Sequence, residues 1–137
     1  MWKYYALLAA FCAALTAIFS KVGVKDINPD LATAVRVSFI LILVWGICLF
    51  SGTAKDLASI SRSGIFFLFL SALATGFSWL FYFRALSLGE VAKVAPIDKL
   101  SVPITMLLAF LFLGETLSLK TIIGGLLITA GTIVMLL

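Results

Sequence analysis

Five apolar stretches without a charged residue dominate this sequence and restrict the folds open to it. They cover positions 4–20, 37–54, 63–83, 100–114 and 121–137. About 20 residues of helix cross the hydrocarbon core of a bilayer, so helices over the shorter stretches must extend through charged flanks. The composition agrees, because 64% of residues are hydrophobic and 12% charged, against about 45–50% and about 25% in soluble domains. The sequence therefore predicts an all-α polytopic membrane bundle of five transmembrane helices.

Turn signals and short connections set the expected helix limits. Asn28-Pro29-Asp30 is a typical helix start, and no connection has room for an extramembrane domain. The first stretch follows Met1-Trp2-Lys3 as a signal peptide would, but it is long enough to remain as an anchor. We expect a single domain over 1–137, with helices at about 3–22, 31–50, 63–86, 91–113 and 119–137.

An acid and a base stand together inside the fourth helix. Asp98 and Lys99 are followed by Ser101 and bracketed by Pro96 and Pro103. Charges at mid-membrane cost about 2.5–3.5 kcal/mol each on insertion scales, so they need partners or a watery cavity. A proline also leaves a backbone carbonyl one turn earlier without its usual donor. This segment is the first candidate for a functional site.

Arg36 is a third ionisable group inside an apolar span, and Lys21 lies at the end of the first. Neighbouring helical residues point about 100° apart, so Asp98 and Lys99 cannot both face Arg36 in the same way. We hypothesise that Asp98 pairs with Arg36 or Lys21 in a coupling or charge network, while Lys99 faces a central cavity and attracts a carboxylate or phosphate. Proton coupling would run through Asp98. The alternative is a purely structural network that fixes the fourth helix against the second.

Aromatic residues of the third helix could form the walls of that cavity. Trp79, Tyr82 and Phe83 share one helical face, and Trp79 and Tyr82 each carry a polar group that needs a partner. The alternative is that these rings face lipid or the membrane interface. The predicted cavity residues are Arg36, Trp79, Tyr82, Asp98, Lys99 and Ser101.

Small residues recur along the fifth helix at intervals that allow close helix contact. They form either a packing surface within the chain or a subunit interface. The residues in question are Thr121, Gly124, Gly125, Thr129 and Gly131.

Lys and Arg are divided almost evenly between the two membrane sides, four against six. Orientation follows the bias of these residues in short loops, so either insertion direction is plausible. Five is an odd number of spans, and two oppositely inserted copies would form an inverted pair.

The sequence lacks the residues that metal sites and many catalytic sites require. The chain has no histidine, and its two cysteines, Cys12 and Cys48, lie within apolar runs. We expect no metal site, no cofactor and no enzyme activity. The basic residues sit at helix ends, where they anchor to headgroups, so nucleic acid is not an expected partner.

The chain resembles the EamA domain of the drug/metabolite transporter superfamily. The resemblance rests on 81–89 (FYFRALSLG), 94–96 (VAP), 111–115 (FLGE after a leucine) and 123–128 with Gly131. The stretches 20–23 and 31–36 resemble the short five-span bacterial and archaeal branch. The resemblance implies a ten-helix transport unit built from two copies in a prokaryotic inner membrane. The first helix lacks the glutamate of the small multidrug exporters, which disfavours cation exchange by their mechanism.

These observations leave three functional interpretations. The first is a secondary transporter for a small organic solute, with an anion or a zwitterion as the candidates, such as a metabolite, amino acid or drug exporter that works by alternating access as a homodimer. The second is a component that flips lipid-linked sugars. The third is a scaffold subunit that transports nothing.

Overall fold

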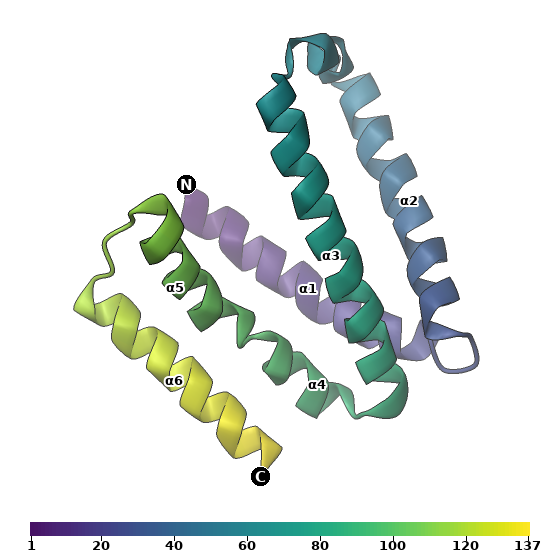
Figure 1. Ribbon diagram of the computed structural model, residues 1–137. Helices are drawn as coiled ribbons and strands as arrows, with labels where there is room; N and C mark the ends of the chain where they lie inside the picture. Colours follow the sequence, from purple (N-terminus) through teal and green to yellow (C-terminus); the bar gives the residue numbers. More distant parts are fainter. The chain divides into compact units, whose positions relative to one another are not determined.

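The computed structural model describes all residues 1–137, and every regular element in it is a helix (Figure 1). Five helical spans are long and apolar enough to cross a membrane, with α4 and α5 counted as one. The prediction of an all-α chain with five spans is confirmed. The elements in chain order are α1 (Trp2–Gly23), α2 (Pro29–Phe50), the 3-10 helix η1 (Thr53–Ser59), α3 (Arg62–Leu88), α4 (Val91–Asp98), α5 (Ser101–Leu113) and α6 (Leu119–Leu136).

Local sequence signals explain where α2 begins and where α5 ends. The Asn28 side chain accepts hydrogen bonds from the backbone N–H groups of Asp30 (2.9 Å) and Leu31 (3.4 Å), and Pro29 occupies the first helical position. Gly114 ends α5 with φ 65°, a conformation that favours glycine.

The chain divides into two compact units, residues 1–88 and 89–137. In the first unit, α3 packs against both α1 and α2, while η1 packs against α2 at the turn between α2 and α3. In the second unit, α6 packs along both α4 and α5. The candidate residues of α1, α2 and α3 therefore belong to a different unit from Asp98 and Lys99.

The fourth expected helix, 91–113, is divided at Lys99 and Leu100. Three short i to i+3 bonds replace the helical pattern there: Lys99 to Pro96, Leu100 to Ile97, and Val102 to Lys99, each 3.0 Å between N and O. Pro103 has no N–H to donate to the Lys99 carbonyl, so the N–H of Val102 takes its place. The sequence predicted a carbonyl without its usual donor one turn before Pro103. In the structure, this position coincides with a break in the span.

Few hydrophobic side chains are buried within the chain. Many leucine, isoleucine and phenylalanine side chains along the spans are more than half exposed. Such a surface suits acyl chains, because lipid tails are as apolar as leucine. The buried hydrophobic residues are Ala17, Val24, Phe83, Leu86 and Val94.

Candidate substrate site

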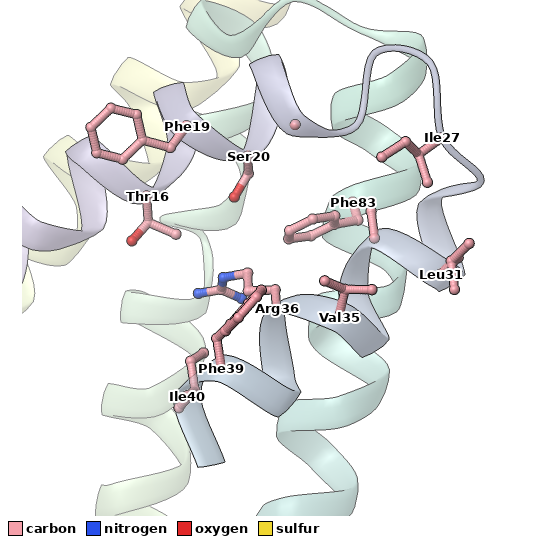
Figure 2. Close-up of a pocket in the computed structure, with 12 residues that line it drawn as sticks. Thr16, Phe19, Ser20, Ile27, Leu31, Val35, Arg36, Phe39, Ile40 and Phe83 are labelled. Atoms are coloured by element: carbon pink, nitrogen blue, oxygen red, sulfur yellow. The ribbon is translucent and has the colours of Figure 1, made fainter. Parts of the chain in front are cut away.

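The first unit contains a cavity of about 480 Å³ (Figure 2). Twelve residues line it, from the end of α1, the loop after α1, the first half of α2, and Phe83 of α3. This volume falls within the range of small-molecule sites, about 300–1,000 Å³. The cavity is therefore large enough for a small organic solute.

Arg36 is the single ionisable residue in the cavity lining. It lies about two turns after the start of α2, well inside an apolar span. Its guanidinium carbon lies 4.3 Å from the centroid of the Trp79 ring and 5.6 Å from that of Phe83. Aromatic faces attract a guanidinium through the ring quadrupole and fix the plane of its fork. Arg36 of α2 thus meets two of the aromatic residues that share one face of α3.

Two hydroxyl groups of α1 complete the polar part of the lining. The Thr16 hydroxyl donates to the Cys12 carbonyl at 2.9 Å, so its lone pairs are left as acceptors. Ser20 is buried, and Figure 2 shows its hydroxyl and the Arg36 guanidinium projecting toward the same space. Neither residue was predicted for the site. A hydroxyl among the alanines of an apolar helix was the signal that could have found them.

Lys21 connects α1 to the end of α3. Its ammonium donates to the backbone carbonyl of Leu86, within the last turn of α3. The last carbonyls of a helix have no intrahelical donor and carry partial negative charge, so a lysine there satisfies and stabilises them. Lys21 thus has a structural partner in the helix end beside the cavity.

Asp30 and Arg84 form an ion pair that the sequence did not predict. Arg84 donates from Nε to Oδ1 (3.1 Å) and from a terminal nitrogen to Oδ2 (2.7 Å), a bidentate arrangement. The pair joins the first turn of α2 to the last turns of α3. By sequence, Arg84 is simply a basic residue at the end of a span, where it can reach the interface. The sequence signal for this pair was an acid in the first turn of one helix, Asp30, and an arginine near the end of the next, Arg84. In two antiparallel neighbouring helices these two positions lie at the same end.

Asp98 and Lys99 lie at the break in the second unit. Their side chains pair at 3.2 Å and are about half exposed. Ser101 begins α5 directly after the break. In the same unit, the hydroxyl of the buried Thr132 on α6 lies 2.9 Å from the Ile128 carbonyl of its own helix and 3.2 Å from the Pro96 carbonyl, so its one proton is shared between these two acceptors. These polar groups therefore gather where the span is discontinuous.

The predicted site residues fall into two groups. Arg36, Trp79 and Tyr82 belong to the first unit, whereas Asp98, Lys99 and Ser101 belong to the second. The network of Lys21, Arg36 and Asp98 stays a prediction.

The small residues of α6 have different environments. A Cβ on Gly125 would lie 2.9 Å from the Met106 methyl, so α6 approaches α5 closely there. A Cβ on Gly124 or Gly131 would meet nothing within 4 Å. The Thr121 hydroxyl contacts Ser118 at 2.8 Å in the cap of α6, and the Thr129 hydroxyl bonds to its own helix.

Comparison with known proteins agrees with this architecture. The model of the EamA-like transporter family matches residues 1–137. A Sinorhizobium protein described as an uncharacterized transporter in the cobO 3' region is 47% identical over 134 residues, which cover 98% of this chain and 95% of the relative. No solved structure matches the chain. The assignment favours transport over catalysis, and this integral, multi-pass membrane chain belongs to the EamA-like transporter family.

Proposed function

We propose that this protein is a secondary transporter that moves a small organic solute across a prokaryotic inner membrane. The observation that carries the proposal is the position of Arg36, inside an apolar span and facing a cavity, in a chain of a transporter family. A cation in a transmembrane helix is costly, and such residues mark substrate or ion pathways. A scaffold could use Arg36 for packing against Trp79 and Phe83, but that packing does not require the open volume beside the charge.

The broken span supports a coupling role for the second unit. Many transporters bind substrates or ions where helices are discontinuous, because freed backbone groups and side chains meet there. Asp98 and Lys99 stand at such a break, and both remain about half exposed. We assign substrate contact to Arg36, support of its guanidinium to Trp79, and proton coupling to Asp98. Trp79 and Tyr82 do not line the cavity, so substrate contact by these two residues stays a prediction.

The working unit in this proposal is a homodimer that alternates between access to the two membrane sides. Five spans per chain would give ten in the pair, and the even distribution of Lys and Arg permits opposite insertion of the two copies. The open sides of Gly124 and Gly131 offer space for close approach of a second helix.

Untargeted mass spectrometry tests the proposal, because it detects any small solute whose distribution changes. Cells that express the protein should shift at least one small solute between cytoplasm and medium. The substitutions Arg36→Gln and Asp98→Asn should abolish the shift while membrane abundance and dimer content stay unchanged. Arg62→Gln, at the start of α3 and outside the cavity, is the matched control and should leave the shift intact.

Two other outcomes would refute transport of a small solute. If the Arg36 and Asp98 substitutions reduced only abundance or dimer content, with no solute shifted by the unaltered protein, the chain would be a scaffold. Accumulation of lipid-linked sugars on one membrane side, with no change in soluble metabolites, would indicate a flippase.

A further inference from the structure

We infer that the cavity of the first unit binds an organic anion with one carboxylate and an apolar body, and that it discriminates against zwitterions and cations. This inference rests on the proposed function, which leaves the charge of the solute open. It follows from three features of the cavity: its charge, the geometry around Arg36 and the chemistry of the remaining lining.

The charge of the lining has one sign. Arg36 is its single ionisable side chain, and no carboxylate lines the cavity. The two acids nearest in sequence do not change this, because Asp26 is exposed in the loop and Asp30 is held by Arg84. A ligand carboxylate could therefore pair with the Arg36 guanidinium. The ammonium of a free amino acid would enter the same apolar space without a carboxylate partner, which is unfavourable.

The surroundings of Arg36 suit a planar carboxylate. The guanidinium carbon lies over the Trp79 ring, 4.3 Å from its centroid, and this contact limits where the fork can point. Arginine binds carboxylates through two parallel N–H···O bonds, which need a fork held in position. The Ser20 hydroxyl projects toward the same space and can donate a further hydrogen bond to a carboxylate oxygen.

The rest of the cavity suits a hydrocarbon or aromatic body. Beyond Arg36, the lining offers only the hydroxyls of Thr16 and Ser20 as polar side-chain groups. A sugar or other polyol would lose hydrogen bonds to water that so few groups cannot replace. The apolar lining includes Phe19, Ile27, Leu31, Phe39 and Ile40. Removal of an apolar ligand body from water into this lining would favour binding.

A matched set of ligands tests the charge preference on the intact cavity. Trp79 is one of three tryptophans, so Trp2→Phe with Trp45→Phe leaves it as the single indole reporter beside Arg36. This protein, in nanodiscs of neutral phosphatidylcholine, is titrated with phenylacetate, its neutral amide phenylacetamide, the zwitterion phenylglycine and the cation phenylethylamine. We expect saturable change in Trp79 fluorescence with phenylacetate, and binding at least about tenfold weaker for the other three.

The variant Arg36→Gln should remove the difference between phenylacetate and phenylacetamide, since it removes the charge but keeps a polar side chain. Equal binding of phenylacetate and phenylacetamide by the unaltered cavity would overturn the inference. So would equal or tighter binding of phenylglycine, or no saturable response to phenylacetate. The ligand comparison does not depend on the folding of any cavity variant.

An anionic lipid headgroup presents related chemistry, and nanodiscs with phosphatidylglycerol distinguish the two sources. If phosphatidylglycerol alone produced the Trp79 response and abolished phenylacetate binding, a lipid would be the occupant and the soluble anion would be refuted.

Counterflow of labelled phenylacetate in liposomes separates this inference from the proposed function. Binding without flux would refute transport but keep the anion site. Flux of phenylethylamine without flux of phenylacetate would keep transport and refute the anion site.

Discussion

The close contact between α5 and α6 predicts that two neighbouring glycines respond differently to the same substitution. A Cβ on Gly125 would lie 2.9 Å from Cε and 3.1 Å from Sδ of Met106. Optimal carbon contacts begin near 3.5 Å, so the end of Met106 would have to retreat by about 0.6 Å even for alanine. Methionine is flexible and can move that far. Leucine adds three further carbons beyond that Cβ, which need more space than alanine does.

We therefore expect Gly125→Leu to lower the free energy of unfolding by about 1–3 kcal/mol, the usual cost of an overpacked contact. Gly124→Leu is the matched control, because a Cβ there meets nothing within 4 Å. It should not lower the free energy of unfolding, since leucine also has a better helix propensity than glycine. Removing the end of the opposing side chain with Met106→Ala should restore part of the stability lost in Gly125→Leu.

The free energy of unfolding can be measured by titration with sodium dodecyl sulfate in detergent micelles, with far-ultraviolet circular dichroism as the signal. Light scattering should confirm a monomeric sample, so that any dimer contact of Gly124 does not contribute. Equal destabilisation by the two leucine substitutions would refute the packing argument. Failure of Met106→Ala to improve the Gly125→Leu variant would also refute it, because the clash would then lie elsewhere.

Three further predictions concern partners and orientation. Asp30→Asn and Arg84→Gln should each lower the melting temperature, and the double variant should lower it by less than the sum of the two decreases. Strictly additive decreases would mean that the two residues of the ion pair are not coupled. The Thr132 hydroxyl reaches the Pro96 carbonyl of α4 as well as the Ile128 carbonyl of its own helix, whereas the Thr129 hydroxyl bonds only to its own helix. Thr132→Val should therefore cost about 0.5–1.5 kcal/mol and Thr129→Val less, and the same detergent titration compares them. A topology reporter fused to the C-terminus should give signals from both membrane sides, and a signal from one side alone would contradict opposite insertion.

Hydropathy and local turn signals were sufficient to predict much of the fold. Uncharged runs, extended through their charged flanks where they were short, predicted all five spans, and Asn28-Pro29 marked the start of α2 to within two residues. These features are local, because a bilayer selects apolar stretches by their own composition and a helix satisfies its backbone internally. The prolines of the fourth span also indicated disturbed backbone, although a single helix was expected over 91–113. The break at Lys99 was not predictable in the same way, because it depends on which N–H groups replace the one that proline lacks.

Only the tertiary structure decided which charged residues meet. Asp30 pairs with Arg84 across 54 positions, and Lys21 reaches the Leu86 carbonyl across 65. Arg36 lies against Trp79 and faces a cavity lined mainly by residues of α1 and α2. The sequence identified Arg36 and Trp79 as candidates, since a charge or a polar ring in an apolar span is conspicuous by itself. It could not identify their partners, because residues far apart in the chain become neighbours only through helix packing, which depends on the fit of side chains across the whole unit.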